Sequence, residues 1–360
     1  MVRDSYEMNI KLLLTVVNEL QDLVFPIDGG VEGAEKYVAQ YKWRFFSVIS
    51  PPGFSSFFCL LFWETMNLFR LPGTEADAIM FLQQKGIAPS KRVCADGHEM
   101  TLKLGSQVRW RCLKRDCRSE VNLRVGNWLE GIRLPLVTVL RFIYGWCWEY
   151  TSVAWCEREL QINHCTAVSM NAILRETCAC WLLGQNEGKI GGQGLIVEVD
   201  ETLFSKRKSN SGRVLPQQWV LGGLCRETGE CFLVAVDDRS VITLMAAIAD
   251  HVEPASTIYT DCWKGYSTKQ LEAAGFQHFT VNHSYNFVDP LTGVHTQNIE
   301  RMWGCLKWRN KRHRGTKRDF LESYFIEFMC RRRMGDDRFA WVLQAIASCF
   351  PPAESLLDDR

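Results

Sequence analysis

The feature that most constrains this chain is an ordered series of strand-like and helix-like segments in its second half. Three β-rich runs come first, at residues 195–200, 219–224 and 231–236, and polar or turn-forming residues separate them. Helical patterns then alternate with strand-like runs, with helices expected at 241–251, 267–274 and from about 297, and strands at 257–261 and 279–281. The order βββαβαβα predicts an antiparallel meander that continues into a mixed α/β sheet.

Three acidic residues stand at significant places in these segments. Asp200 closes the first strand, Asp261 closes the fourth, and Glu300 lies on the last helix. With the first and fourth strands adjacent, the two aspartates are neighbours, and the last helix brings Glu300 over them. On that helix Glu300 falls beside an apolar stripe formed by Ile299, Trp303 and Leu306. The pattern therefore predicts a carboxylate cluster.

Converging carboxylates are typical of metal-assisted phosphodiester chemistry, in which two divalent cations relieve the mutual repulsion of the acids. Hard oxygen ligands of this kind favour Mg²⁺ or Mn²⁺. Any one of the three acids is alternatively a solvated surface charge. Local rivals for the same role are Glu198, Glu201, Asp237 and Asp238. The positions at strand ends favour the first three acids over these rivals.

A second constellation has the spacing of a metal site and consists of Cys94, His98, Cys112 and Cys117. It reads Cys-x3-His, a gap of thirteen residues, and Cys-x4-Cys. Each pair fits on one tight turn, and one tetrahedral Zn²⁺ ion can join the two turns. Four protein ligands predict a structural zinc ribbon whose folding depends partly on the metal. Ordinary buried cysteines are the alternative, since the chain has 15 cysteines and the spacings depart from the commonest two-residue gaps.

The surroundings of this cluster are basic. The cations outnumber four nearby acids and are Lys91, Arg92, Lys103, Arg109, Arg111, Lys114, Arg115, Arg118 and Arg124. The ribbon either lies on phosphate or presents a solvated surface. Further along, residues 149–160 and 166–183 have the lengths of a helix-turn-helix, whose second helix can lie in the major groove of DNA. Two packed helices without a role in DNA binding are the alternative.

Four ordered motifs occur in the second half of the chain. They are Val199–Thr202, Tyr259–Tyr266, Val281–Ser284 and Phe287–Lys307. Together they resemble Merlin-type transposases and their bacterial insertion-sequence relatives, and the last motif looks like that family's signature around its catalytic glutamate. Upstream, Phe81–Ile87 followed by the Cys/His cluster is similar to the family's leading helix and zinc ribbon. The resemblance covers roughly residues 75–333.

This resemblance implies a DDE-type DNA transposase with a ribonuclease-H-like catalytic core. It implies metal ligation by Asp200, Asp261 and Glu300, and cut-and-paste movement of an element bounded by terminal inverted repeats. Water aligned by two Mg²⁺ or Mn²⁺ ions would cleave the phosphodiester, and the released 3′-hydroxyl would attack target DNA. Paired element ends lead us to expect a homodimer or a larger assembly. The alternatives are a host-retained DNA-binding protein without catalysis and a nuclease of the same fold that does not join strands.

Basic residues follow Glu300 closely. Between Arg301 and Met334, eleven lysines and arginines stand against three acids, which gives a local charge of plus eight. A phosphate-facing patch is predicted at Lys307, Arg309, Lys311, Arg312 and Arg314. Residues 311–314 alternatively form a nuclear import signal, and a solvated helix face is a further alternative. Lys307 and His295 either hold phosphate or order the glutamate helix, whereas Trp303 and Trp308 are expected in the core.

Composition restricts the partners and the compartment. The formal net charge of +1 means that a nucleic-acid partner must be met by local patches. The N-terminus lacks a signal-peptide pattern, so 15 cysteines indicate a reducing intracellular compartment, which is the nucleus in a eukaryote. The most apolar run, at residues 54–63, is too short to cross a membrane.

We expect five parts along the chain. They are an unassigned extension at 1–73, a leading helix and zinc ribbon at 74–130, a helical DNA-binding candidate at 131–190, the ribonuclease-H-like domain at 191–335 and a C-terminal tail at 336–360. The leading helix is predicted to begin at the N-cap Thr74, with Glu75 and Asp77 in its first turn, and to stop at Gly86.

Overall fold

The central sheet of the molecule has five strands in the order β10-β9-β5-β6-β7. The structure is a computed structural model that describes residues 67–105, 107–185, 189–204, 218–312 and 316–355. The strands are β5 (Ile196–Leu203), β6 (Trp219–Cys225), β7 (Cys231–Val236), β9 (Thr257–Asp261) and β10 (Gln277–Val281). The β5-β6-β7 meander is antiparallel, whereas β9 pairs in parallel with β5 and β10. The predicted mixed α/β sheet of ribonuclease-H-like type, with its first and fourth strands adjacent, is confirmed.

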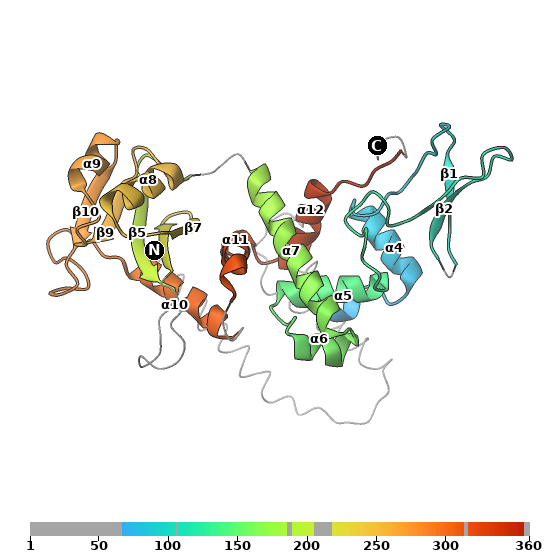
Figure 1. Ribbon diagram of the computed structural model, residues 1–360, viewed down its shortest axis with the longest axis horizontal. Coiled ribbons are helices and arrows are strands. Elements are labelled where there is room, and N and C mark those ends of the chain that lie inside the picture. Colours follow the sequence, from blue (N-terminus) through green and yellow to red (C-terminus); the bar gives the residue numbers. More distant parts are fainter. Residues whose placement is uncertain (1–66, 106, 186–188, 205–217, 313–315, 356–360) are drawn as a thin grey trace, which may run out of the picture. The chain divides into compact units, whose positions relative to one another are not determined.

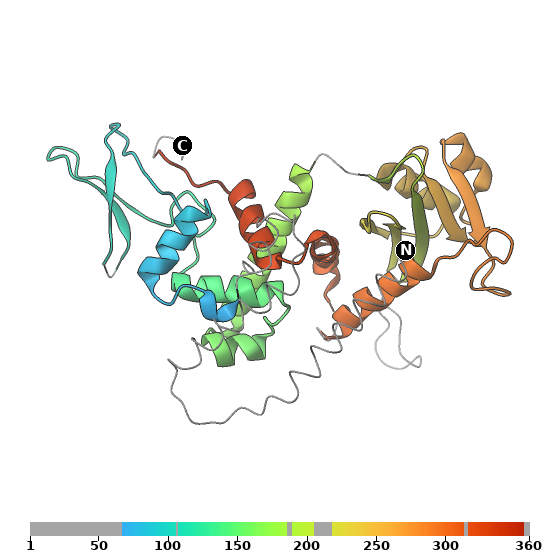
Figure 2. The same ribbon diagram turned by 180° about the vertical axis from the view of Figure 1, so that it is seen from behind.

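Helices cover both faces of this sheet (Figures 1 and 2). Because side chains alternate along a strand, Val197 and Val199 of β5 face one side, where they pack in a core with α8 (Val241–His251) and α9 (Thr268–Ala273). On the opposite side, Val220 of β6 packs with α10 (Gln297–Arg312). This alternation leaves the even-numbered residues of β5 facing α10.

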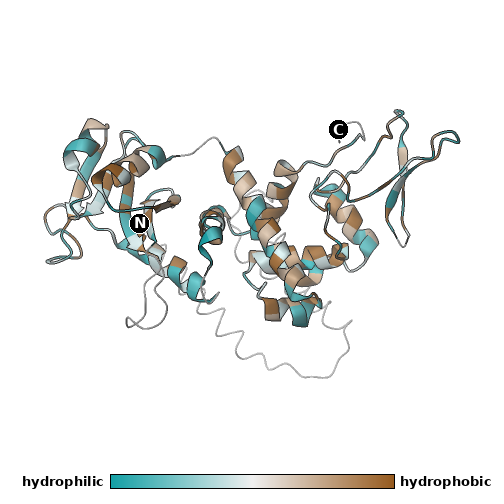
Figure 3. Cartoon of the chain, viewed as in Figure 1, coloured by the Kyte–Doolittle hydropathy of each residue, from teal (hydrophilic) through white to brown (hydrophobic). Residues whose placement is uncertain are grey.

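The α10 helix has a hydrophobic stripe on an otherwise polar surface, and its colours alternate along its length in Figure 3. Its buried residues are Ile299, Met302, Trp303 and Leu306, a spacing that places them on one side of a helix. They pack with α11 (Leu321–Arg333) in the core that lies against β6. One side of α10 is thus fixed to the sheet while the other side is exposed.

The residues before the sheet form a second body of helices and a small ribbon. The helices are α4 (Glu75–Gln84), α5 (Leu136–Cys147), α6 (Val153–Leu160) and α7 (His164–Gly184), and the ribbon strands are β1 (Met100–Lys103), β2 (Arg109–Cys112) and β3 (Glu120–Asn122). A two-stranded pair, β4 (Ile190–Gly191) and β8 (Val252–Glu253), joins the end of this body to the sheet. The ribbon strands pair antiparallel in the order β1-β2-β3.

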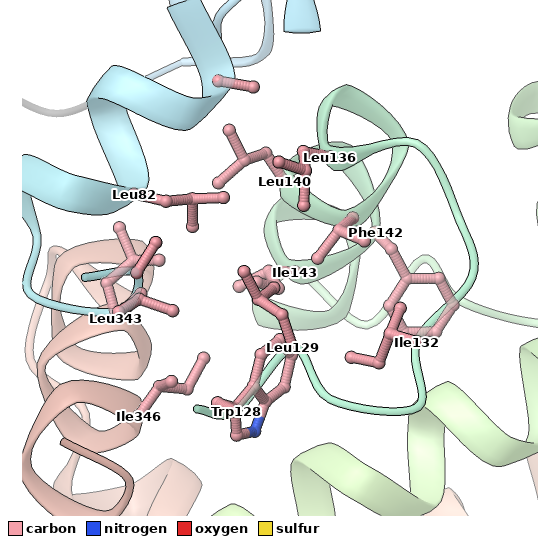
Figure 4. Packing of buried hydrophobic residues seen from close by; sticks show 14 of the residues in the cluster. Leu82, Trp128, Leu129, Ile132, Leu136, Leu140, Phe142, Ile143, Leu343 and Ile346 are labelled. Atoms are coloured by element: carbon pink, nitrogen blue, oxygen red, sulfur yellow. The ribbon is translucent and has the colours of Figure 1, made fainter. Parts of the chain in front are cut away.

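A large hydrophobic core holds these helices together (Figure 4). Leu82 of α4 and Leu140 of α5 are fully buried there beside Leu343 of α12 (Arg338–Cys349). The C-terminal residues expected as a tail therefore include a helix that completes the core of a segment far away in sequence. The predicted domain boundaries stay predictions, and most of the proposed extension, residues 1–66, lies outside the described residues.

The leading helix α4 begins and ends where the sequence predicts. The Thr74 side chain accepts a hydrogen bond from the Asp77 backbone N–H, and Gly86 follows the helix with a φ of +70°. The side chain of Glu75 has a further role, because it accepts hydrogen bonds from the backbone N–H groups of Leu136 and Val137 at the start of α5. One helix therefore caps the next. Among the described residues, no helix is both long and apolar enough to cross a membrane.

Candidate active site

Asp200 and Asp261 lie on two neighbouring parallel strands. Asp261 ends β9 as predicted, whereas β5 does not close at Asp200 but continues to Leu203. The register of β5 and β9 pairs Glu198 with Tyr259. Continuing that parallel register by two residues sets Asp200 opposite Asp261, with both side chains on the same face of the sheet. Both residues are partly buried. The structure therefore brings the two predicted aspartates together.

The Asp200 carboxyl lies in an unfavourable place for a negative charge. Burial, together with the nearby carboxylates of Glu201 and Asp261, raises the pKa of Asp200 to about 7. The indole N–H of Trp303, which donates to Asp200 Oδ2 at 2.9 Å, works in the opposite direction. A divalent cation between these carboxylates would remove the repulsion, so the donor set fits a hard metal ion such as Mg²⁺ or Mn²⁺.

The α10 helix is fixed along β5 by polar contacts at three successive levels. Glu198, Asp200 and Thr202 contact Asn298, Trp303 and Lys307, respectively. The spacing is a consequence of geometry, since four to five residues of helix rise about 6–7.5 Å and two residues of strand rise about 6.7 Å. The even-numbered residues of β5 thus match successive turns of α10.

A fully buried carboxylate, that of Glu198, caps the start of α10. Its Oε2 atom accepts hydrogen bonds from the backbone N–H groups of Asn298 at 2.9 Å and Ile299 at 3.0 Å, and its Oε1 atom accepts from Asn298 Nδ2 at 2.7 Å. These N–H groups have no partner within the helix, and the positive end of the helix dipole attracts the carboxylate.

Arg226 and His295 complete this cap, which we call the Glu198 clasp. Arg226 Nε donates to Glu198 Oε1 at 2.6 Å, while Nη2 of the same guanidinium donates to the His295 carbonyl oxygen at 2.7 Å. The His295 ring also lies near this carboxylate, with its Nδ1 atom 3.7 Å from Glu198 Oε1. The clasp consists of Glu198, Arg226, His295, Asn298 and Ile299, and it fixes the helix that carries Glu300.

Glu300 is exposed on α10, one turn before Trp303. His283, from the segment that follows β10, lies close to it, with 3.5 Å between Nε2 and Glu300 Oε1. The same Nε2 atom is 2.8 Å from the Thr296 hydroxyl at the start of α10. Two motifs that are separate in the sequence therefore meet at this helix. Sequence reasoning did not assign a role to His283.

A glycine allows Trp303 to approach the sheet. A Cβ atom at Gly222 of β6 would lie 2.7–2.8 Å from the Trp303 ring, closer than such contacts normally allow. The indole accordingly rests on a strand that has no side chain at this point. Trp303 is buried as expected, and its position on the sheet directs its N–H to Asp200.

The rival acids have other partners. Glu201 accepts hydrogen bonds from the Tyr266 hydroxyl and from Arg239 at 2.5 and 3.1 Å, although burial still raises its pKa. Asp238 accepts hydrogen bonds from the backbone N–H of Ser240 and from the Thr243 hydroxyl, and these bonds lower its pKa. Together with the clasp of Glu198, these contacts give three of the four rivals a structural function; Asp237 is exposed.

The basic patch predicted after Glu300 is partly committed to contacts within the protein. Lys307 Nζ donates to the Thr202 hydroxyl at 2.5 Å. Arg309 is largely buried and pairs with Glu327 at 3.0 Å and Glu149 at 3.6 Å. Burial works to raise the pKa of Glu327, but Arg331 and Arg309 together hold it below its usual value.

The remaining cations of this patch lie further along the helix. Arg312 contacts Glu149 at 3.6 Å and Lys311 is exposed, whereas Arg314 lies outside the described residues. Contact of these residues with DNA stays a prediction. Trp308 corrects an expectation, because 58% of it is exposed and it is not part of the core. Its position follows from helix geometry, since the buried residues of α10 point to the other side.

The four residues of the Cys/His cluster lie close enough together to hold one metal ion. One ligand atom from each of Cys94, His98, Cys112 and Cys117 lies within 4.8 Å of all the others. The Sγ atoms of Cys94 and Cys117 are 3.6 Å apart, and Cys112 Sγ is 3.7 Å from His98 Nδ1. Bonds of about 2.3 Å from Zn²⁺ to sulfur in a tetrahedron require about 3.8 Å between sulfurs. The donor set therefore fits a structural zinc ion.

Several basic side chains near this cluster also form contacts within the protein. Arg109 and Arg111 pair with Glu120, and Arg92 is buried and donates to the Val125 carbonyl oxygen. Arg124 donates to the carbonyl oxygens of residues 132 and 134. The number of basic residues in the ribbon thus overstates the charge that remains for a partner.

The helix pair expected as a helix-turn-helix is present as α6 and α7. Ser152 and Asn163 cap the two helices, and Gln161 makes the turn in the left-handed region with a φ of 54°. The exposed residues in the first two turns of α7 are uncharged or weakly basic and are His164, Cys165, Val168 and Ser169. Insertion of α7 into DNA stays a prediction.

Sequence comparisons connect the sheet domain with transposases. Residues 191–332 match the family described as ISXO2-like transposase domain. A transposase-like protein from Haemophilus influenzae is 28% identical over 96 residues, which are 27% of this chain and 75% of that protein. The segment from β4 to α11, which contains the aspartate pair and the clasp, is therefore similar to an insertion-sequence-type transposase domain.

Solved structures with partial similarity include an integrase core domain and a chain of an intasome complex. The catalytic core domain of BIV integrase has a TM-score of 0.27 at 10% identity, and the match covers 37% of this chain and 80% of that one. A chain of the simian T-cell lymphotropic virus intasome in complex with PP2A regulatory subunit B56 gamma has a TM-score of 0.25 at 17% identity, covering 47% of this chain and 58% of that chain. The fold assignment rests on the strand order and directions of the sheet itself.

Loss of the clasp should loosen α10. We expect Glu198→Ala to lower the free energy of unfolding by roughly 2–4 kcal/mol, because it leaves the Arg226 guanidinium and two helix N–H groups without their buried partner. Urea unfolding measures the change, and hydrogen exchange should accelerate at the start of α10. The exposed Glu272 provides the control, with Glu272→Ala within about 0.5 kcal/mol of the wild type. Equal stability of both variants would contradict the clasp.

The raised pKa of Asp200 predicts a pH-dependent effect of Asp200→Asn. Ionisation of Asp200 opposes folding as pH rises from its ordinary pKa of 3.8 to about 7, since the folded state holds the proton more tightly. In buffer without Mg²⁺ or Mn²⁺, the variant should therefore match the wild type near pH 4 and be more stable, by roughly 1–3 kcal/mol, at pH 8.

The control for this experiment is Asp250→Asn, which changes an exposed acid of α8. Its stability relative to the wild type should not vary in the same manner across this pH range. Thermal unfolding at several pH values provides the measurement. An Asp200→Asn protein that is less stable than the wild type at pH 8 would show that the carboxylate is not destabilised by its surroundings.

Metal analysis tests the ribbon. The purified chain should contain about one zinc ion, and Cys112→Ala should remove it, since three ligands hold a structural zinc much more weakly than four. Cys165→Ser, at an exposed cysteine of α7, should leave the zinc content unchanged. A wild-type protein without bound zinc, or a Cys112→Ala protein with a full complement, would exclude the assignment.

Proposed function

We propose that this chain is a DDE-type DNA transposase, which cleaves DNA at the ends of an element and joins those ends to target DNA. The observation that carries the proposal is the pair Asp200 and Asp261 on adjacent parallel strands, below a helix that bears Glu300. All three lie within the segment that is similar to the ISXO2-like transposase domain. Within the insertion-sequence relatives, the motif at Phe287–Lys307 favours the Merlin type.

Asp200, Asp261 and Glu300 would hold Mg²⁺ or Mn²⁺ in this proposal. When bound, two such ions activate the attacking oxygen and stabilise the negative charge that develops on the phosphate. The high pKa of Asp200 supports the assignment, because a carboxyl that is poorly stabilised by protein groups gains most from a cation. The rival acids Glu198, Glu201 and Asp238 accept hydrogen bonds from protein donors and have less to gain.

The surrounding residues would position these ligands. The Trp303 N–H holds one oxygen of Asp200, which leaves the other oxygen for an ion. The Glu198 clasp fixes the start of α10 and thereby the height of Glu300 above the sheet. His283, 3.5 Å from Glu300, restrains that side chain or contacts a phosphate beside it. Each of these groups would act by orientation and not by bond making.

The rest of the chain would serve DNA recognition and assembly. In this proposal the ribbon holds a structural Zn²⁺ ion at Cys94, His98, Cys112 and Cys117, and supports binding to the terminal inverted repeats. Lys311 and Arg312, together with Arg314, would contact DNA phosphates beyond the active site. Two element ends must be brought together, so a homodimer or larger assembly is proposed. In a eukaryotic cell the protein would act in the nucleus.

The test is metal-dependent nicking and joining of DNA that carries the inverted repeats flanking the gene. We expect Asp200→Ala to reduce both reactions by roughly a thousandfold or more, because the ions supply several kcal/mol of transition-state stabilisation. Asp250→Ala, at an exposed acid of α8, serves as the matched control and should retain activity. Gel analysis of labelled DNA ends with Mg²⁺ or Mn²⁺ measures both steps.

The outcomes separate the alternatives. Equal cleavage by wild type and Asp200→Ala would contradict the role of Asp200. Specific occupancy of the repeats without cleavage at any metal concentration would indicate a DNA-binding protein derived from a transposase. Cleavage without joined product would indicate a nuclease of the same fold.

A further inference from the structure

The exposed side of α10 continues past Glu300 as a surface that the cleavage chemistry does not use. Gly304, Cys305 and Trp308 lie on this side, one to two turns beyond the glutamate. The helix extends beyond β5 in this direction (Figure 1). A strand of DNA that leaves the active site along α10 would therefore meet these residues.

A hollow of about 460 Å³ opens on this side of the helix. It is lined by Gly304, Cys305 and Trp308 of α10 and by residues from other elements, namely Glu149, Arg309, Phe328, Arg331, Arg332 and Arg338. The volume lies within the range of about 300–1,000 Å³ that is usual for ligand sites. Four of its lining residues are arginines and one is a glutamate, so we call it the arginine groove.

The arginines of this groove divide into two pairs. Arg309 and Arg331 are held by the buried Glu327, and Arg331 also donates to the carbonyl oxygens of residues 146 and 147. Arg332 is exposed and contacts the Gly229 carbonyl oxygen at 3.2 Å, whereas Arg338 lies 5.3 Å from the centre of the Trp148 ring. Among the described residues, neither Arg332 nor Arg338 forms an ion pair with an acid, so both can pair with an anionic partner.

Trp308 supplies an aromatic face beside these cations. The side chain is 58% exposed, and the Arg312 guanidinium lies 5.6 Å from the centre of its ring. One turn earlier, a Cβ atom at Gly304 would meet nothing within 4 Å, so the helix surface is open at this residue. A single exposed aromatic residue has no special meaning, but an indole among arginines matches the sites that hold single-stranded nucleic acid.

We infer that the arginine groove binds unpaired nucleotides of the DNA strand adjacent to the cleaved phosphate. One base stacks on Trp308 while Arg332 and Arg338 hold neighbouring phosphates. Base stacking requires an unpaired base, which distinguishes this site from contacts to duplex phosphates alone. The inference rests on the proposed function, since it takes the strand to come from the site at Glu300.

Charge favours DNA over a second copy of the chain as the occupant. A copy that offered the same surface about a two-fold axis would set arginines against arginines, which is unfavourable without intervening anions. A polyanion instead neutralises Arg332 and Arg338 and releases its own counterions.

The experiment uses the full-length chain with Asp200→Asn, which permits binding to be measured without cleavage. The probe is a fluorescein-labelled single-stranded oligonucleotide of mixed sequence, compared with a blunt duplex of the same length. We expect Trp308→Ala to weaken binding of the single strand by about tenfold and of the duplex by less than twofold. Trp308→Phe should restore most of the affinity because it keeps an aromatic face. Phe69→Ala, at an aromatic residue that is 96% exposed, serves as control and should not change binding.

The cations have a separate signature. Arg332→Ala and Arg338→Ala should each reduce the slope of log affinity against log salt concentration by about 0.7, the change expected for one lost phosphate contact on a single strand. Lys269→Ala, at an exposed lysine of α9, should leave the slope unchanged. An oligonucleotide that contains 5-iodouracil should crosslink on irradiation to the peptide with Trp308.

Several results would overturn the inference. Unchanged affinity of Trp308→Ala for the single strand, or a crosslink that maps elsewhere, would remove the groove as a nucleotide site. A change in sedimentation of Trp308→Ala without a change in DNA affinity would assign the groove to a second copy. Thermal unfolding identifies variants that fail to fold. If Trp308→Ala is among them, the single-strand affinity of Trp308→Phe tests the groove instead, and an affinity far below that of the wild type would contradict the inference. Cleavage by the wild-type protein is measured separately. If the wild type cleaves DNA but the groove does not bind nucleotides, only the inference about the groove is wrong. If the groove binds nucleotides but the wild type does not cleave DNA, only the proposed function is wrong.

Discussion

The candidate site depends on the ionic cap that Glu198 forms at the start of α10. This helix carries Glu300, yet its sequence alone does not fix its position on the sheet, because a hydrophobic stripe permits sliding and rotation. The fully buried carboxylate of Glu198 bonds two backbone N–H groups of the helix, and Arg226 holds the other oxygen. Since Asp200 lies two residues further along the same strand, the residue that fixes the helix and the residue beneath it share one rigid element.

The same device recurs in the helical body, where Glu75 caps α5 from another helix. In both places an acid far away in sequence satisfies N–H groups that a local cap leaves open. Cations are fixed in a similar way, since Glu327 holds both Arg309 and Arg331 in a buried cluster. The basic residues of this segment thus divide into buried or partly buried ones and exposed ones, and among the described residues the exposed ones are Arg301, Lys311, Arg312, Lys317, Arg318 and Arg332.

The sequence was sufficient for the sheet because its information is local. Alternation and turn residues predict β5, β6, β7, β9 and β10, although β5 extends beyond the predicted end at Asp200, and the N-cap Thr74 predicts where α4 begins. The role of Glu198 was not predictable in that way, since its partners lie about 100 residues further along the chain, and it appeared only as a rival to Asp200. The packing of α12 against α4 and α5 was not predictable either, because these helices are far apart in the sequence. Which acids bind metal, and which cations meet DNA, stay predictions.

Three acids on one strand show how environment assigns different functions to equal groups. Glu198, Asp200 and Glu201 are all partly or wholly buried, so each needs compensation for lost hydration. Glu198 receives it from helix N–H groups and a guanidinium, and Glu201 from a phenol and a guanidinium. Asp200 has the Trp303 N–H as its side-chain donor and a second carboxylate beside it. Among the described residues, the fold supplies cations to Glu198 and Glu201 and none to Asp200, so that carboxylate keeps its raised pKa.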